Sequence, residues 1–395
     1  MNPFKKLTVL SLEQATVVPY LTYRLAMDGM KVIRLEHPVH GDPNRMIGEN
    51  FLNEEKMNSY FMAINAGKKA LTLNLADPRG AALLDELLVK LEVDIFATNQ
   101  LPRNYDKLSI SHDRLSRLRP ELIWLGVTGF GPDSNEAAYD PILQARGGLM
   151  ELTGEPDGFP QVVGVPLPDM GTSEHCYGQV MKALYERQLT GRGRRIDVSM
   201  FMSSTSWLTV PVTLTALGKK ITRRGNTHEF FAPVSVYRTR DGFVYVAVGN
   251  DRQWAALTGL AEFVELAREE YRTNAGRIKD VHNLNRAMNE VLGRRDSREV
   301  INLLNGIGVP VSEIKAIDQV IDDPLVRRAL LFSRDPRTGK ELTLAPPPVA
   351  TSFLEEENRR LCFPPRLGEH NLAIYGGVLG KTGEELDDLK EKGVI

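Results

Sequence analysis

Short apolar runs alternate with amphipathic segments along the first half of the chain. Runs typical of buried strands occur at residues 7–12, 31–36, 70–75, 93–97 and 122–128. Between them, apolar residues recur with helical spacing at residues 20–27, 78–91 and 112–118. Strands that alternate with helices predict βαβ units, a parallel sheet and an α/β fold class. We therefore expect a large doubly wound domain over residues 1–200.

The pattern changes after Gly218. Strand-like runs at residues 231–237 and 243–248 flank Asp241-Gly242, a sequence typical of a hairpin turn. Mostly helical patterns follow, so we predict a linker helix over residues 201–224 and a smaller α+β domain over residues 225–330. Residues 331–395 do not resume the α/β pattern, which means that this last segment must pack on a structure already formed.

Composition narrows the class of protein. A chain of 395 residues exceeds a usual single core, and a net charge of -2 gives no reason to expect nucleic acid or an acidic membrane as partner. Only two cysteines are present, without metal-ligand spacing, so we expect no disulfide framework, no metal site and a reducing compartment. The chain starts without a signal pattern and contains no membrane-length apolar run, which predicts a cytoplasmic protein.

The first βαβ unit does not have the sequence of a dinucleotide site. The turn after the first predicted strand, residues 13–19, contains no glycine. Backbone therefore cannot approach a pyrophosphate closely there, and a nicotinamide cofactor is not expected. Ligands of such sheets still bind beyond the carboxyl ends of the strands, where residues 16–17, 36–37, 99–100 and 129–131 fall.

Asp169 stands at the start of a helical pattern and follows two prolines. The apolar face of that helix is formed by Tyr177, Val180, Met181 and Leu184. This spacing predicts Asp169 as the N-cap. Such an aspartate either only caps the helix or is a nucleophile, which the backbone N–H groups and the positive helix end would keep ionised.

A series of different short motifs lies along the chain from Val9 to His370. They are Val9-Leu10, Asp28-Gly29, Lys31-Val-Ile-Arg34 with Glu36, Asn65 with Lys68-Lys69, Leu73-Asn74-Leu75, Pro78 with Gly80, Gly129-Phe-Gly-Pro132, Tyr139-Asp140, Gly147-Gly148, Asp169, Thr190-Gly191 with Gly193, Gly225-Asn226 with His228, Asp241-Gly242, Gly308-Val309-Pro310, Asp323-Pro324 and Leu367-Gly368-Glu369-His370. In this order the chain resembles the class III CoA-transferases of the formyl-CoA transferase and carnitine CoA-transferase type. At family level it also resembles the succinyl-CoA:benzylsuccinate branch.

The resemblance implies a fold and an activity. It implies a Rossmann-like large domain built from both chain ends, which residues 331–395 complete, and two interlocked subunits that share the active site. The partner subunit would be a second copy or a related chain. The implied reaction moves coenzyme A from an acyl-CoA, such as succinyl-CoA, to a carboxylic acid through a mixed anhydride and a thioester of Asp169. Coenzyme A is then a substrate, and no cofactor is bound permanently.

Site residues follow from the same resemblance. It implies coenzyme A contacts at Thr16, Val17, His37, Leu73, Asn99, Gln100, Lys107, Tyr139 and Asp140. Gly147 and Gly148 are candidates by position for backbone donors to an oxyanion. Among residues judged by their own chemistry, Arg146 suits a substrate carboxylate or a structural ion pair. The aromatic residues that suit an apolar acyl pocket or core packing are Tyr60, Phe230 and Phe231.

Two alternatives remain open. An α-methylacyl-CoA racemase needs a base on each side of Cα, and Tyr139 is a poor base at neutral pH, so racemisation is disfavoured. A non-catalytic coenzyme A-binding subunit is the second alternative, against which the presence of Asp169 argues. The glycine-rich loop of formyl-CoA transferase has no counterpart between Leu217 and Ala232, which makes formyl transfer to oxalate doubtful.

Overall fold

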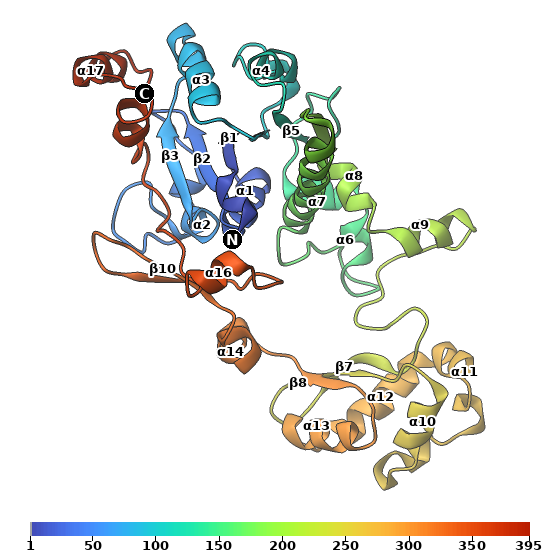
Figure 1. The fold of residues 1–395 in the computed structure, drawn as a ribbon. Helices are drawn as coiled ribbons and strands as arrows, with labels where there is room; N and C mark the ends of the chain where they lie inside the picture. The colour runs from blue at the N-terminus through green and yellow to red at the C-terminus, as the bar shows by residue number, and fades with distance from the viewer. Residues whose placement is uncertain (1) are drawn as a thin grey trace. The chain divides into compact units, whose positions relative to one another are not determined.

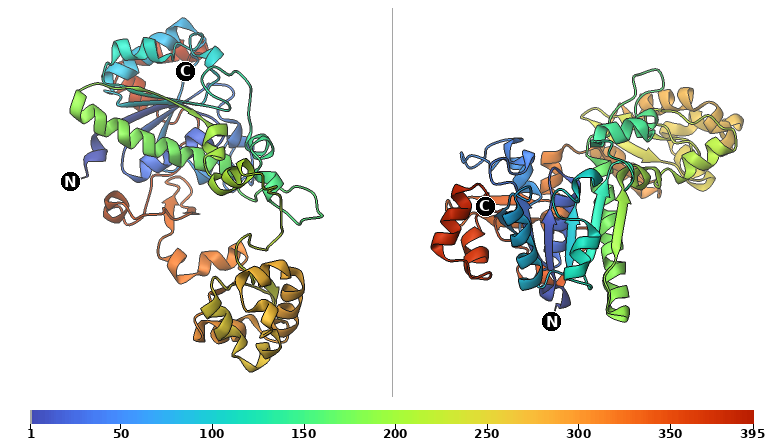
Figure 2. Two further views of the ribbon diagram at one scale, coloured as in Figure 1. Left: turned by 90° about the vertical axis from the view of Figure 1, so that its right-hand side faces the viewer. Right: turned by 90° about the horizontal axis from the view of Figure 1, so that it is seen from above.

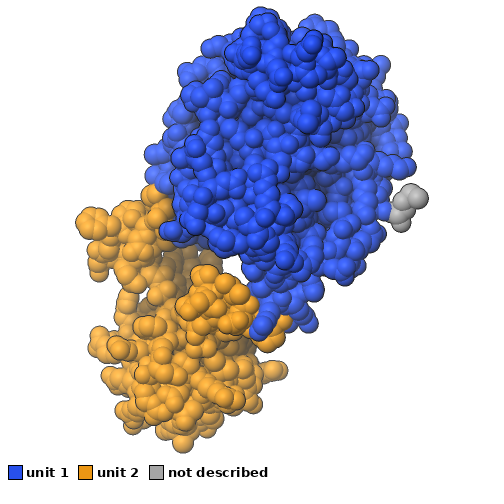
Figure 3. Space-filling model, turned by 90° about the vertical axis from the view of Figure 1, so that its left-hand side faces the viewer, with its two compact units in different colours: residues 1–148, 163–217, 325–395 blue, residues 149–162, 218–324 orange. Residues whose placement is uncertain are grey.

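The computed structural model describes residues 2–395 and divides them into two compact units (Figures 1 and 3). Unit 1 comprises the described residues up to Gly148 together with residues 163–217 and 325–395. Unit 2 comprises residues 149–162 and 218–324. Unit 1 therefore takes its residues from both ends of the chain, and a short segment before Val163 belongs to unit 2.

A six-stranded parallel sheet forms the centre of unit 1, in the order β3-β2-β1-β4-β5-β6. Its strands are β1 (Thr8–Leu12), β2 (Lys31–Glu36), β3 (Lys68–Thr72), β4 (Ile95–Thr98), β5 (Ile123–Thr128) and β6 (Arg195–Ser199). The predicted α/β class is confirmed. The order reverses between β1 and β4, which places a crevice for ligands at the carboxyl ends of these two strands.

Apolar residues cover both faces of this sheet, because successive strand residues point to opposite sides. Leu10 and Ile33 pack with α3 (Pro78–Lys90), α4 (His112–Leu118) and the C-terminal segment. Their neighbours Val9 and Val32 pack with α1 (Val17–Met27) and α7 (Leu167–Thr190). The helices thus lie on both sides of the sheet, as Figure 2 shows.

Two local predictions about unit 1 were wrong. The third strand begins at Lys68, two residues earlier than the apolar run, and ends at Thr72. No strand was predicted between residues 128 and 231, but Arg195 begins β6, which pairs with β5. β6 is an edge strand and buries only Ile196 fully, so it lacks the continuous apolar run of a central strand.

The remaining helices of unit 1 are short. They are α2 (Ser59–Ala63), α5 (Asp140–Arg146), α8 (Met200–Thr205), α9 (Thr209–Ala216), α15 (Pro324–Arg327, whose first residue belongs to unit 2), α16 (Ser352–Glu356), α17 (Gly383–Glu391) and the turns η1 (Pro3–Lys6), η2 (Pro43–Met46), η3 (Pro102–Asn104) and η6 (Leu372–Gly376). Residues 217–224, the last part of the predicted linker helix, are not helical. No helix within residues 2–395 has the length and apolar character needed to cross a membrane.

Unit 2 combines a small sheet with helices. The antiparallel strands β7 (Val234–Arg238), β8 (Phe243–Ala247) and β9 (Val311–Glu313) pair in this order, so the predicted hairpin is confirmed. Trp254, Phe263 and Leu284 belong to its core. Its helices and turns are α6 (Leu149–Leu152), α10 (Asp251–Thr258), η4 (Ala261–Leu266), η5 (Glu269–Tyr271), α11 (Asn274–Lys279), α12 (Val281–Leu292), α13 (Ser297–Gly306) and α14 (Ile317–Asp322).

The C-terminal segment closes one edge of the large sheet. After a hairpin of β10 (Leu331–Arg334) and β11 (Glu341–Leu344), the chain reaches β3. Backbone N–H groups on and just after β3 donate to His370 Nδ1 (3.2 Å), Asn371 Oδ1 (3.0 Å) and the Val394 carbonyl (2.7 Å). The expectation that this segment packs on an existing structure is confirmed, and the edge donors of β3 are satisfied without a seventh strand.

Candidate active site

Asp169 lies in the first turn of α7, not at its N-cap. The helix begins at Leu167 with Pro166 as its N-cap, so the predicted cap was three residues late. Pro168 stands within the first turn, where a missing N–H costs nothing. The Asp169 N–H donates to Asp140 Oδ2 (3.1 Å), while its own carboxylate accepts no hydrogen bond from residues 2–395. Asp169 is thus fixed through its backbone, and its carboxylate is left available.

A cavity of about 200 Å³ opens beside this carboxylate at the carboxyl ends of β1, β4 and β5. The residues that line it are Gln14, Ala15, Thr16, Val17, Asn99, Leu101, Val127, Thr128, Gly129, Ala137, Ala138, Tyr139, Asp140, Asp169 and Met200. Thr16, Val17, Asn99, Tyr139 and Asp140 were predicted to be site residues, and the structure brings all five to the cavity of Asp169.

The lining contains two carboxyl groups and no lysine, arginine or histidine. Burial and the nearby charge of Asp140 together raise the pKa of Asp169 to about 7. The expectation that the helix end keeps this carboxylate firmly ionised was therefore wrong for the unliganded protein. The first-turn N–H is already engaged by Asp140, and the buried setting disfavours a second negative charge. At neutral pH both protonation states of Asp169 are populated.

Asp140 begins α5 and is held from two sides. Gln144 Nε2 donates to its Oδ1 (2.6 Å), and the Asp169 N–H donates to its Oδ2. The other end of the Gln144 side chain, Oε1, accepts the Val163 N–H (2.8 Å). Burial raises the pKa of Asp140, and these two donors partly oppose that effect. Both carboxylate oxygens of Asp140 are occupied.

The loop after β1 carries Thr16 and Val17 to the cavity. Ala15 adopts a φ of 60°, which costs energy for a residue other than glycine. Its N–H donates to Asp42 Oδ1 (3.1 Å), and its carbonyl accepts from Asn44 Nδ2 (2.6 Å). These two side chains hold the loop in its strained conformation.

Two further contacts tie this loop to its neighbours. The Gln14 backbone bonds the Asn99 side chain twice, at 3.2 Å from its N–H and 2.8 Å to its carbonyl. The hydroxyls of Thr16 and Tyr60 lie 3.0 Å apart. Tyr60 was predicted as a substrate residue, and this bond brings it to the cavity through Thr16, although its ring does not line it.

A buried cluster of six charged groups supports the same loop. Three carboxylates pair with three cations, so its formal charge is zero: Glu13, Glu36 and Asp42 with Arg34, Arg45 and Lys68. Lys68 Nζ lies 3.0 Å from Glu13, Arg45 binds Glu36 at 2.6 Å, and Arg34 binds Asp42 at 2.7 Å. Burial lowers the pKa of Lys68 to about 8 although Glu13 opposes this. The cluster is stable only as a complete set, because loss of one member leaves a buried charge without its partner.

A second cavity of about 230 Å³ lies at the ends of β1, β2 and β3. It contains His37, Leu73 and Gln100 from the predicted coenzyme A residues, and Gln14 lines both cavities. His37 stacks on His40 with ring centroids 4.8 Å apart. Burial and His40 lower the pKa of His37, so it does not supply a fixed positive charge at neutral pH. Lys107 is exposed and lines neither cavity.

Arg146 and the glycines that follow it do not reach the cavities. Arg146 pairs with Glu136 at 3.0 Å and covers the ring of Phe130 at 4.2 Å, so of the two predicted roles the structure shows the ion pair. The Gly147 and Gly148 N–H groups donate to carbonyls at the end of α5, at 2.8 and 3.4 Å. Their candidacy as oxyanion donors was wrong, because helix termination already uses these groups.

The two aromatic candidates beyond Gly218 belong to unit 2. Phe230 and Phe231 are exposed, and both contact the ring of His228, with centroids 6.0 and 5.2 Å from it. They do not form part of a unit 1 cavity.

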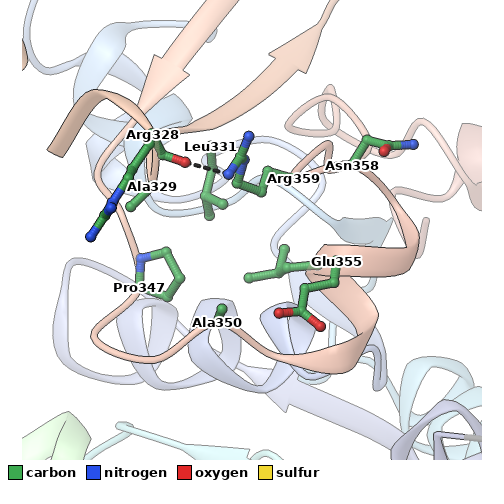
Figure 4. A pocket seen from close by; sticks show the side chains of 9 residues that line it. Arg328, Ala329, Leu331, Pro347, Ala350, Glu355, Asn358 and Arg359 are labelled. Carbon is green, nitrogen blue, oxygen red and sulfur yellow. Dashed lines mark hydrogen bonds between the residues drawn. The ribbon is translucent and has the colours of Figure 1, made fainter. Parts of the chain in front are cut away.

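A third cavity, of about 460 Å³, lies in the C-terminal part of unit 1 (Figure 4). It is lined by Arg328, Ala329, Leu331, Pro347, Ala350, Leu354, Glu355, Asn358 and Arg359. The Arg359 guanidinium donates to the Arg328 carbonyl at its edge. None of the predicted site residues lines this cavity, and it is separate from the lining of Asp169.

Sequence reasoning missed Gln144, which does not line the cavity but donates to Asp140. It lies four residues after Asp140 on α5, the spacing at which side chains on a helix meet. That spacing was the available signal. It became informative only once Asp140 was known to contact the helix of Asp169. Among residues 2–395, no group of three or more His, Cys, Asp or Glu side chains is arranged to hold a metal ion.

Comparison with known proteins identifies the family. A model described as CoA-transferase family III matches residues 4–371. The chain belongs to CoA-transferase family III. It is a family III CoA-transferase, as the order of its motifs predicted.

Curated relatives in family III align along nearly the whole chain. Succinyl-CoA:glutarate CoA-transferase of Mus musculus is 29% identical over 401 residues, which cover 100% of this chain and 91% of the relative. Formyl-CoA:oxalate CoA-transferase of Streptomyces coelicolor is 30% identical and covers 98% of each chain.

A solved structure supports the fold. A CAIB/BAIF family protein from Brucella suis matches with a TM-score of 0.82 and 30% identity, covering 95% of this chain and 99% of that chain.

Proposed function

We propose that this enzyme transfers coenzyme A from succinyl-CoA to a carboxylic acid through covalent intermediates on Asp169. The observation that carries the proposal is the half-buried carboxylate of Asp169, which has no cation beside it, in the first turn of α7 at the cavity beyond the carboxyl ends of the sheet. The names of the relatives support succinyl-CoA as donor and a dicarboxylate such as glutarate as acceptor.

Each step of the proposed reaction exchanges one anion for another. The Asp169 carboxylate attacks the thioester carbonyl and forms the new C–O bond, the C–S bond breaks, and coenzyme A leaves as thiolate, so that a mixed anhydride of Asp169 and succinate remains. The thiolate then attacks the Asp169 carbonyl and releases succinate. The acceptor carboxylate attacks the resulting aspartyl-CoA thioester, and the freed thiolate takes the acceptor acyl group from the second anhydride. Asp169 is regenerated, and no proton is transferred.

The environment of Asp169 suits this role. A carboxylate whose pKa is about 7 is a more basic, stronger nucleophile than an exposed one and remains ionised in a large fraction of molecules at neutral pH. For the tetrahedral oxyanions, we propose the backbone N–H groups at the start of α1, where Thr16 and Val17 line the same cavity. Thr16 makes no side-chain cap bond there.

We further propose that the enzyme acts as a homodimer. α9 buries none of its residues, although Val210, Val212 and the following Leu217 are exposed by 49, 57 and 79%. An apolar helix that buries none of its residues fully against the rest of residues 2–395 favours a protein partner. A second copy of this chain supplies one without requiring a different subunit. Sedimentation at micromolar concentration tests this, and a monomer would contradict it.

Trapping the acyl-enzyme tests the nucleophile. The enzyme is incubated with succinyl-CoA and hydroxylamine or borohydride, and its peptides are mapped by mass spectrometry. We expect a mass change at Asp169 and a loss of transfer of at least about a thousandfold in Asp169→Asn, as for removal of a covalent nucleophile. Asp113→Asn, which changes an exposed aspartate of α4, is the matched control and keeps full activity.

Two results would contradict the proposal. One is an unmodified Asp169 under turnover together with an active Asp169→Asn variant. The other is solvent deuterium entering Cα of a 2-methylacyl-CoA without acyl exchange, which would favour the racemase alternative.

A further inference from the structure

Asp140 contacts the nucleophile's helix in a way that coenzyme A binding does not require. Its Oδ2 accepts the Asp169 N–H at 3.1 Å, and its Oδ1 accepts from Gln144 at 2.6 Å. Gln144 is fully buried, and its Oε1 accepts the N–H of Val163 at 2.8 Å. Val163 is the first residue of unit 1 after the segment 149–162 of unit 2. A continuous series of hydrogen bonds therefore joins Val163, where the polypeptide returns to unit 1, to the first turn of α7.

We propose that Asp140, oriented by Gln144, is a positioning residue that fixes the first turn of α7 and makes the Asp169 carboxylate a stronger nucleophile. This inference rests on the proposed function of Asp169. It replaces the expected coenzyme A contact of Asp140, because each of its oxygens already accepts one hydrogen bond and its negative charge would repel the phosphates of coenzyme A.

Asp140 is the charged side chain that faces Asp169 from the elements around it. The start of α1 contributes Thr16 and Val17, and the β4 loop contributes Asn99 and Leu101. The end of β5 contributes Val127, Thr128 and Gly129, the loop before α5 contributes Ala137, Ala138 and Tyr139, and α8 contributes Met200. Tyr139 is neutral at physiological pH. No cation among these residues offsets the repulsion between the two carboxylates.

This repulsion ends when Asp169 is acylated. The anhydride and the thioester of Asp169 are both neutral, whereas the free carboxylate is not. The Asp140 charge therefore raises the free energy of the free nucleophile more than that of either covalent intermediate. Gln144 keeps Asp140 in place by donating to it. The bond from the Asp169 N–H to Asp140 keeps the two carboxyl groups at a fixed distance from each other.

A swap of amide and carboxylate separates charge from hydrogen bonding. In the single variant Asp140→Asn, the new amide N–H₂ faces the Gln144 N–H₂, so one bond is lost together with the charge. The double variant combines Asp140→Asn with Gln144→Glu. The carboxylate now at position 144 accepts from the new amide at position 140 and from the Val163 N–H, and the oxygen of that amide still accepts the Asp169 N–H. All three bonds are restored, while the charge stands one bond further from Asp169.

The readout is the pre-steady-state rate of acylation of Asp169 by succinyl-CoA from pH 5 to 9, measured by rapid quench and mass spectrometry on the intact enzyme. In the plot of acylation rate against pH, we expect the rise on the acid side (the acid limb) to occur about one pH unit lower in the double variant than in the wild type, because a neighbouring like charge is removed. We also expect its plateau rate to fall about three- to tenfold with the lower basicity of the nucleophile.

The outcomes separate the two proposals. If the double variant regains the wild-type acid limb and plateau, Asp140 serves only through its hydrogen bonds, and the inference about its charge is wrong. If the limb shifts down in both variants, the inference holds. If the wild type forms no adduct at Asp169, the proposed function itself has failed. Circular dichroism of the double variant confirms that its fold is unchanged.

Discussion

Replacing Asp169 by asparagine should stabilise the protein increasingly as the pH rises. Asparagine keeps the size of the side chain and removes a charge that burial and Asp140 disfavour. The pKa of Asp169 is raised from 3.8 to about 7 on folding, so the unfolded chain releases this proton more readily than the folded protein does. The wild-type protein therefore keeps its full free energy of unfolding below about pH 4, where Asp169 is protonated in both states. It loses part of that free energy as the pH rises towards 7.

The size of the effect follows from these two pKa values. One pKa unit is worth about 1.4 kcal/mol, so the wild type loses about 1.5 kcal/mol by pH 5 and about 4 kcal/mol by pH 8. The variant escapes this loss. Other consequences of the substitution are independent of pH, so the difference in unfolding free energy between variant and wild type should grow by about 2.5 kcal/mol between pH 5 and pH 8.

Urea denaturation of both proteins at each pH unit from 5 to 9, followed by far-ultraviolet circular dichroism, measures this difference. Asp106→Asn is the control, because Asp106 is exposed and forms no ion pair among residues 2–395. A flat or falling difference for Asp169→Asn would show that the carboxylate is well stabilised in the fold. The explanation of its reactivity by burial and repulsion would then be refuted.

Two further substitutions test the packing and the charges around the site. Gly171→Ala places a Cβ about 2.5 Å from the Trp207 indole, so we expect a loss of about 1–3 kcal/mol and a shift in tryptophan emission, with stability restored by adding Trp207→Ala. Lys68→Met removes the nearer of the two cations beside buried Glu13 and leaves Arg34 at 3.7 Å, which should cost about 3–5 kcal/mol by urea denaturation. Adding Glu13→Gln should recover part of that loss, and no recovery would mean that the two side chains act independently.

Sequence periodicity located most of the helices and strands because each of them buries one regular set of apolar residues. The helix over residues 112–118 and the strand over residues 31–36 have the predicted bounds, since each shows a regular apolar pattern. β6 was missed because an edge strand needs few apolar residues. The start of α7 was predicted after the two prolines, Pro166 and Pro168, and was therefore misplaced, because proline is accepted in the first turn of a helix.

The site was predictable where residues come from strand ends and not where side chains meet across elements. Thr16, Val17 and Asn99 follow strands, so topology alone brings them together at the cavity. The contact of Asp140 with the Asp169 N–H joins two helices, and no local pattern encodes it. The pKa of Asp169 could not be predicted either, because it depends on which groups surround a helix end in three dimensions.

The closure of the β3 edge has a consequence for how the protein is made. The backbone N–H groups of β3 and of the loop after it have His370, Asn371 and Val394 as acceptors, and these are made about 300 residues later in the chain. The strands of the sheet therefore emerge from the ribosome while this edge is still open, although all residues of unit 2 have been made before His370. Until the last residues emerge, β3 can pair with a strand from another nascent chain. We therefore expect the residues from His370 onward to protect the newly made protein from aggregation as well as to complete its fold.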